Sequence, residues 1–250
     1  SPAGFRERHR FENFAGFTGR VSKAGLQELL ADPEVLYVEP VRILEPHLAQ
    51  GIPLMNAATV RSTHNGAGVA VAVCDTGVDY THPMLGNGGF PNGKVIGGYD
   101  FGNNDANPAP KKEAHGTCCA GIVAGGTGTV GDYIGGVAHG AKLYALKITT
   151  DTSGSASSAA MVSAWDWCVT HQNDDPANPL MVISTSFGGG RYYSAASADA
   201  ASPSMTLAAG NAAAAGITVL ASSGNEGYCD SMSWPAGIST VFSVGAVYDA

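Results

Sequence analysis

The chain has 250 residues, of which 14% are charged and 34 are Gly, and its formal net charge is −8. This length suits one large domain with or without a small appendage, and the composition excludes a disordered chain. The acidic balance leaves no basic surface for nucleic acid or an anionic membrane, and no apolar run reaches the roughly 18 residues of a spanning helix.

Residues 7–47 predict a strand, a helix and a second strand. Apolar residues alternate loosely over residues 8–21, Ser22 is suited to cap a helix, and Pro33 stops that helix. Residues 34–43 (EVLYVEPVRI) then predict a short strand. Because so small a unit buries little surface by itself, we expect it to pack on the rest of the chain. Residues 45–57 show neither period and predict a linker.

From Gly68 onward, apolar strands alternate with helical segments. The strands are predicted at residues 68–77, 94–101, 141–148, 179–190, 216–227 and 241–249, and the helices at residues 115–126, 157–172 and 195–215, the last with a break near Pro203. This alternation predicts an α/β fold, namely a doubly wound, mostly parallel sheet flanked by helices, preceded by part of a small α+β unit.

Polar residues follow several of these strands. Asp75 and Asn225 come at strand ends, and His115 opens a helix. Each is by itself an ordinary turn or cap residue. Together they suit acid–base chemistry, because a carboxylate can hold one imidazole nitrogen while an amide donates to a developing oxyanion. The glycines of residues 186–190 (SFGGG) leave backbone groups open to an added peptide strand.

The five cysteines predict no disulfide framework or zinc knuckle, because their number is odd and no C-x-x-C pair occurs; they are Cys74, Cys118, Cys119, Cys168 and Cys229. We expect small buried side chains. A thiol close to His115 suggests sensitivity to mercurials, but a cysteine protease is rejected because Cys118 lies on the helix of the base itself.

The segments VAVCDTGVDYTHP, HGTCCAGIVAG, VISTSFGG and ITVLASSGNEG, taken in this order, resemble the subtilisin-like serine proteases, or subtilases. The resemblance covers about residues 50–250. It implies that Asp75 is the aspartate of the catalytic triad, that His115 is the general base and that Asn225 completes the oxyanion hole. It also implies substrate-binding segments, which are Ser186, Phe187 and Gly188, then Gly154, and then Ser222, Ser223 and Gly224.

Residues 1–48 resemble the C-terminal part of the inhibitor-like subtilase propeptide with its cleavage linker, and residues 49–250 the N-terminal portion of the catalytic domain. The resemblance implies that this propeptide is an intramolecular inhibitor and that the chain cuts itself near Leu48 and Ala49. It also implies a secreted or cell-surface protein, whose signal peptide we expect to have been removed upstream of residue 1.

The Gly-Thr-Ser-Met-Ala motif that carries the nucleophile in subtilases does not occur in this sequence. Ser204 is rejected because it precedes Asn225 and lacks the Gly-Thr lead. Three explanations stay open: a nicked enzyme whose serine lies on a second chain or C-terminal fragment, a truncated sequence, or a protein that never had the serine.

No cofactor is certain. Ca²⁺ is possible as a structural ion, but Met84 stands where subtilases often carry a calcium-binding Asp, and a thioether is a poor ligand for this cation.

The sequence therefore predicts a serine endopeptidase acting on polypeptides, with its serine supplied beyond residue 250. The alternative is a non-catalytic peptide-binding scaffold or an inactive N-terminal fragment. A nucleotide-binding domain is disfavoured because G-x-G-x-x-G is absent.

Overall fold

A parallel sheet of six strands forms the centre of the structure, which is a computed structural model that describes residues 4–41, 43–46, 60–61, 63–128, 133 and 135–246. The strand order is β12-β10-β8-β4-β6-β5, and each neighbouring pair is parallel. The strands are β4 (Ala70–Asp75), β5 (Val95–Asp100), β6 (Lys142–Lys147), β8 (Leu180–Thr185), β10 (Thr218–Ser222) and β12 (Phe242–Val244). The predicted parallel α/β sheet is confirmed.

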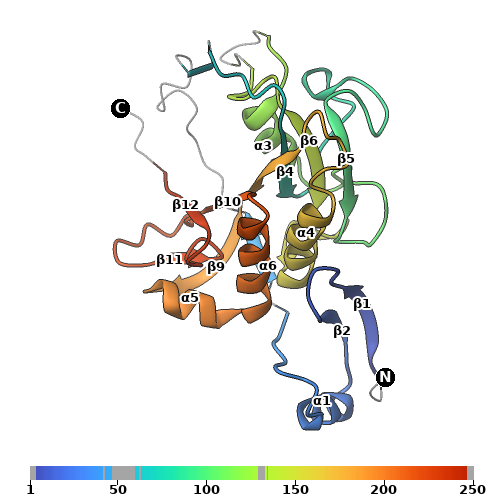
Figure 1. The fold of residues 1–250 in the computed structure, drawn as a ribbon, viewed down its shortest axis with the longest axis vertical. Coiled ribbons are helices and arrows are strands. Elements are labelled where there is room, and N and C mark those ends of the chain that lie inside the picture. Colours follow the sequence, from blue (N-terminus) through green and yellow to red (C-terminus); the bar gives the residue numbers. More distant parts are fainter. Residues whose placement is uncertain are drawn as a thin grey trace.

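Helices cover both faces of this sheet, as Figure 1 shows. Helix α3 (His115–Ala124) covers one face, and α4 (Ser158–Thr170) and α6 (Pro203–Ala214) cover the other. Helix α5 (Ala195–Ala201) packs on α6, and a short 3₁₀ turn, η2, spans Pro83–Leu85. Alternate residues of β4 point to opposite faces, so Ala72 belongs to the core with α4 and α6 whereas Val73 belongs to the core with α3. Burial on both faces explains why this strand is a continuous apolar run.

The sheet changes its winding direction at β4. From β4 the chain moves to β5 and β6 on one side, and it then crosses to β8 and β10 on the other. In such sheets the crevice beyond the carboxyl ends of the central strands is the usual ligand site. Asp75 is the last residue of β4 and therefore lies at that edge.

A second, antiparallel sheet has the order β11-β9-β3-β7. Its strands are β3 (Ile43–Pro46), β7 (Ala156–Ser157), β9 (Phe187–Tyr192) and β11 (Met232–Trp234). The backbone of β3 pairs with β7 through residues 43 and 44 and with β9 through residues 45 and 46. A segment from the N-terminal part of the chain thus lies between two segments that follow it by more than 100 positions.

The N-terminal unit consists of the antiparallel pair β1 (Arg6–Arg10) and β2 (Phe17–Arg20), followed by α1 (Lys23–Ala31). Ser22 caps α1 as predicted, since its hydroxyl accepts from the N–H of Gly25 at 3.1 Å. The strand predicted over residues 34–43 is wrong: residues 35–41 pair with no other strand, and β3 begins at Ile43. A β-propensity run becomes a strand only where a partner edge is available.

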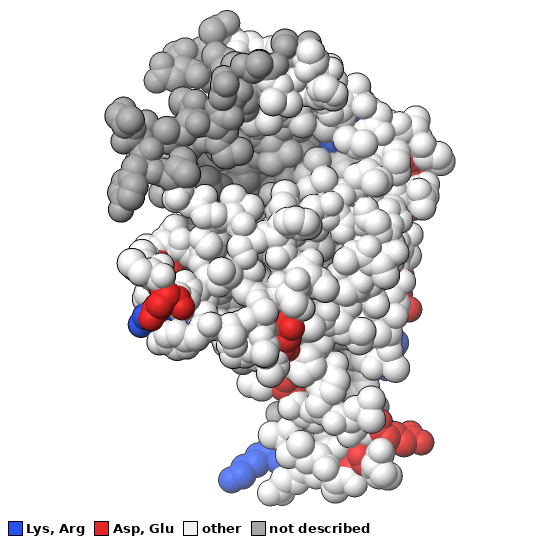
Figure 2. Space-filling model, turned by 60° about the vertical axis from the view of Figure 1, so that its left-hand side comes forward, with Lys and Arg blue, Asp and Glu red and all other residues white. Residues whose placement is uncertain are grey.

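The unit projects from the sheet layer below α4 in Figure 1. Figure 2 shows a face with few charged side chains on the main body, and acidic and basic groups on the lower lobe formed by this unit.

Candidate active site

Asp75 and His115 come together at the carboxyl edge of the sheet. His115 Nδ1 lies 2.7 Å from Asp75 Oδ1. The Asp75 side chain is 1% exposed and that of His115 is 17% exposed, so the pair is largely shielded from water. The two residues are 40 positions apart, and β4 and the first turn of α3 bring them into contact.

Thr76 and Gly116 fix the relative position of β4 and α3. The Thr76 hydroxyl accepts from the N–H of Gly116 at 2.9 Å and donates to the carbonyl of Glu113 at 3.1 Å. A Cβ at Gly116 would collide with the carbonyl of Gly77 and lie 2.9 Å from Cβ of Asp75. Only glycine therefore allows the helix to approach the aspartate this closely.

The second imidazole nitrogen of His115 has no partner among the described residues. Nε2 is buried and accepts or donates no hydrogen bond there. The ring of Phe187 meets the imidazole edge to face, with centroids 6.0 Å apart. An imidazole held by a carboxylate on one side and open on the other can act as a general base toward a group placed at Nε2.

A buried thiol also contacts this pair. Cys119 Sγ lies 3.4 Å from Asp75 Oδ2 and 3.7 Å from His115 Nδ1. The sequence predicted a thiol near His115 but did not identify which one. Helical spacing could not decide between them, because the positions three and four after His115 both neighbour it on α3. Burial decides: Cys119 is buried and Cys118 is exposed.

Asn225 follows β10 by three residues and lies at the same edge of the sheet. Gly224 has φ +116°, and a Cβ there would strike Glu226 and Ser233, so only glycine fits this turn. The carboxylate of Glu226 accepts from the Ser233 hydroxyl at 3.3 Å. Ser222 ends β10, and Ser223 donates its N–H to the carbonyl of Val244.

The remaining predicted substrate segments border β3. Gly188 pairs with residue 45 and Phe187 with residue 46, and Ser186 directly precedes them. Gly154 lies two residues before β7, which pairs with residues 43 and 44. The structure therefore has an extended strand between these segments. Leu48 and Ala49, the predicted cleavage site, lie outside the described residues.

An ion cluster that the sequence did not reveal supports the approach to β7. Lys147, 1% exposed at the end of β6, donates to Asp100 at 2.7 Å and also pairs with Asp151. Burial alone would lower the pKa of Lys147, but the hydrogen bonds that it donates to Asp100 and Asp151 outweigh this effect and raise the pKa. The cluster ties the end of β5 to the loop that leads to Gly154. A lysine inside a strand carries no recognisable sequence signal for such a role.

Met84, where the sequence makes a calcium ligand doubtful, contacts the segment that follows α3. Its carbonyl accepts from the N–H of Gly126 at 2.7 Å, and its thioether lies against Gly128. Within the described part of the chain, one group of three potential metal-binding side chains occurs, namely Asp75, His115 and Cys119. Over the described ranges, the structure contains no helix that meets the length and hydropathy of a membrane span.

Comparison with known proteins places this geometry in context. The profile of the subtilase family matches residues 66–250. Subtilisin E of Bacillus subtilis (strain 168) is 30% identical over 254 residues, covering 99% of this chain and 60% of that protein. Subtilisin-like protease 1 of Arthroderma otae is 28% identical, covering 98% of this chain and 48% of that protein. The chain thus spans 60% or less of the length of these relatives.

Solved structures of subtilisin-related proteins have a similar fold. Fervidolysin of Fervidobacterium pennivorans, described as a keratinolytic enzyme related to subtilisin, is 27% identical with a TM-score of 0.55, covering 74% of this chain and 25% of that one. The epidermin leader peptide processing serine protease EpiP of Staphylococcus aureus has a TM-score of 0.66 over 96% of this chain and 63% of that one. At 14% identity, the second likeness concerns the fold alone.

Proposed function

The chain belongs to the subtilase family, and from this premise we propose that it is part of a serine endopeptidase that hydrolyses polypeptides through an Asp-His-Ser triad. The observation that carries the proposal is the 2.7 Å contact between His115 and Asp75, together with the buried Nε2, which has no partner among the described residues. In this mechanism Asp75 orients His115 and stabilises its imidazolium form. His115 takes the proton of the attacking serine, and Asn225 donates to the oxyanion.

The nucleophilic serine is proposed to come from beyond residue 250. Support comes from the missing Gly-Thr-Ser-Met-Ala motif and from relatives that are longer than this chain. Ser204 lies at the start of α6, and its hydroxyl donates a hydrogen bond to Glu39. It is therefore unsuited to the role of nucleophile. A hydroxyl within hydrogen-bond reach of Nε2 would complete the acyl-transfer site.

Substrate is proposed to bind as an added antiparallel strand between β7 and β9. The position of β3 supports this, because a four-residue peptide backbone already pairs there with both strands. Main-chain pairing supplies affinity that is largely independent of sequence, while side-chain pockets supply selectivity. Gly154 and the segments at residues 186–188 and 222–224 are the proposed contacts.

Residues 1–48 are proposed to act as an inhibitory propeptide and residues 49–250 as the start of the catalytic domain. The propeptide would occupy the substrate cleft with β3 and be removed by autoprocessing at Leu48 and Ala49. The match to Subtilisin E, which covers 99% of this chain, supports this division, since it includes residues before Gly66. The protein would then be a secreted or cell-surface zymogen, as suits a relative of the subtilisins.

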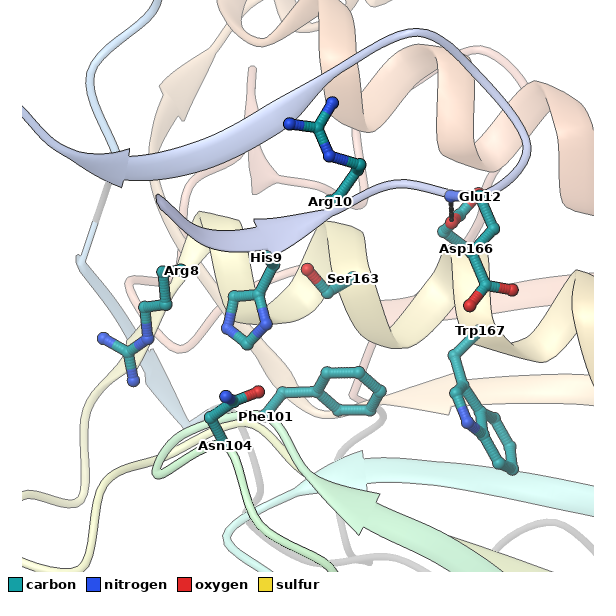
Figure 3. A pocket seen from close by; sticks show the side chains of 9 residues that line it. All are labelled: Arg8, His9, Arg10, Glu12, Phe101, Asn104, Ser163, Asp166 and Trp167. Carbon is teal, nitrogen blue, oxygen red and sulfur yellow. Dashed lines mark hydrogen bonds between the residues drawn. The ribbon is translucent and has the colours of Figure 1, made fainter. Parts of the chain in front are cut away.

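The packing of the N-terminal unit on α4 supports the inhibitor role. Asp166, 3% exposed, accepts hydrogen bonds from the N–H groups of Glu12 at 2.7 Å and Asn13 at 3.3 Å, and from the Asn13 side chain at 2.9 Å. Figure 3 shows the Glu12–Asp166 bond at one end of a cavity, and His9 and Phe101 together toward the other. A buried carboxylate satisfied by backbone donors of another segment anchors that segment strongly.

A fluorophosphonate probe tests the proposal on the full-length protein. The expected result is labelling of one serine beyond residue 250, lost in His115→Ala, whose fold is checked by circular dichroism. Folded protein that does not label and hydrolyses no casein would refute the protease. If such protein still bound peptides, the non-catalytic scaffold would be the better assignment. Intact-mass measurement then shows whether the serine lies on this chain or on a second fragment.

A further inference from the structure

The two carboxylate oxygens of Asp75 have different partners. Oδ1 meets His115 Nδ1 at 2.7 Å and accepts the N–H of Thr76 at 2.7 Å. Among the described residues, the partner of Oδ2 is the thiol of Cys119, whose sulfur lies 3.4 Å away. The sulfur is within the normal range for an S–H hydrogen bond, and its residue is 4% exposed.

The thiol keeps its proton and is therefore a donor. Burial, followed by the negative charge of Asp75, raises the pKa of Cys119 far above its usual value, and a hydrogen bond from Ser186 only partly opposes this. A protonated thiol beside a carboxylate can donate to it but cannot act as a nucleophile. This chemistry separates Cys119 from the cysteines of cysteine proteases.

We propose that Cys119 is a positioning residue, whose S–H group holds Asp75 through Oδ2 and moderates the negative charge that this carboxylate presents to His115. The proposal rests on the proposed protease function. A donor to an ionised carboxylate stabilises its charge, so less of that charge is available to stabilise a neighbouring imidazolium. Because S–H is a weak donor, the thiol would reduce the basicity of His115 only slightly and would leave Asp75 ionised.

In the described part of the chain, few other charged groups lie near the contact between Cys119 and Asp75, so a substitution of the thiol tests this contact directly. The neighbouring groups Thr76, directly after β4, and Phe187, on β9, are uncharged. On α3 the other titratable group is Cys118, which is exposed. The nearest acidic side chain of the preceding loop, Glu113, lies against Gly154.

The test compares Cys119→Val, which keeps the approximate volume and removes the donor, with Cys119→Ser, which keeps a donor. Cys118→Ala is the matched control on the same helix. For Cys119→Val, the acid limb of the pH profile of kcat/KM should move up by about 0.3–0.5 pH unit, as expected for a weak hydrogen bond to a charged group. For Cys119→Ser it should stay at or below the wild-type position, and Cys118→Ala should not move it.

A second readout does not depend on activity. Titration of the His115 imidazole by NMR in the same full-length variants should show the same order of midpoints. If the His115 midpoint shifts equally in Cys119→Val and Cys119→Ser, or does not shift in Cys119→Val, the thiol has a packing role only and the proposal is refuted. Cys119→Ala replaces the valine variant if the latter does not fold. Absence of peptide hydrolysis and of fluorophosphonate labelling in the wild type would refute the protease function, whereas the NMR titration would still decide the role of the thiol.

Discussion

Replacing Lys147 by methionine should destabilise the protein by about 3–5 kcal/mol, the usual cost of removing one partner from a buried ion pair. Lys147 and Asp100 are each 1% exposed and lie 2.7 Å apart across β6 and β5. Methionine preserves most of the volume, so the loss is electrostatic. Among the described residues, Asp100 would then keep the N–H and side-chain donors of Asn103.

Thermal unfolding of the full-length protein, followed by circular dichroism, measures this effect. In a domain of this size each kcal/mol lowers Tm by about 2–4 °C, which corresponds to a decrease of roughly 6–20 °C. Asp151→Asn is the matched control: its side chain is 43% exposed, and a solvent-screened pair contributes at most about 1 kcal/mol.

The double variant Lys147→Met with Asp100→Leu distinguishes the cause. Replacing both ions by apolar groups is often close to neutral, so it should regain most of the lost stability. If Lys147→Met unfolds at the same temperature as Asp151→Asn, the buried pair is not the stabilising unit, and the reasoning is refuted.

Three further predictions concern the active site and the N-terminal unit. Asp75→Asn should lower kcat by about 10⁴-fold because an amide cannot hold the required imidazole tautomer, and steady-state kinetics showing less than about a tenfold loss would contradict the triad. Burial, followed by the charge of Arg8, lowers the pKa of His9 below its ordinary 6.5. Packing of this unit should therefore be strongest above that value and weaken as the pH falls from 6.5 toward the lowered pKa. Hydrogen exchange of residues 6–20, corrected for intrinsic rates, should show this trend, and His9→Gln should abolish it. Glu39→Gln should lower the free energy of unfolding by about 0.3–1 kcal/mol, because a carboxylate stabilises the N-terminus of a helix, here α6. Unchanged unfolding by denaturant would argue against this contribution.

Much of the fold was predictable because its signals are local. Each buried strand of the parallel sheet is an apolar run that ends near glycine or a polar residue, and Ser22 and Pro33 mark the two ends of α1. The Ala-rich segment breaks into α5 and α6 at Ser202, directly before the predicted Pro203. The short strand β11 was missed, because three residues are too few to show a period.

The sequence by itself determined the α/β architecture and the identity of Asp75, His115 and Asn225 as candidates, because strand ends, helix starts and their order are written in local residue patterns. Only the tertiary structure decided that β3 pairs with β7 and β9, that Lys147 joins the end of β5 to the loop after β6, and that Cys119 rather than Cys118 meets the carboxylate of Asp75. These contacts join residues that are distant in the chain or select one face of a helix. Their energies depend on how the elements pack, which no local pattern specifies.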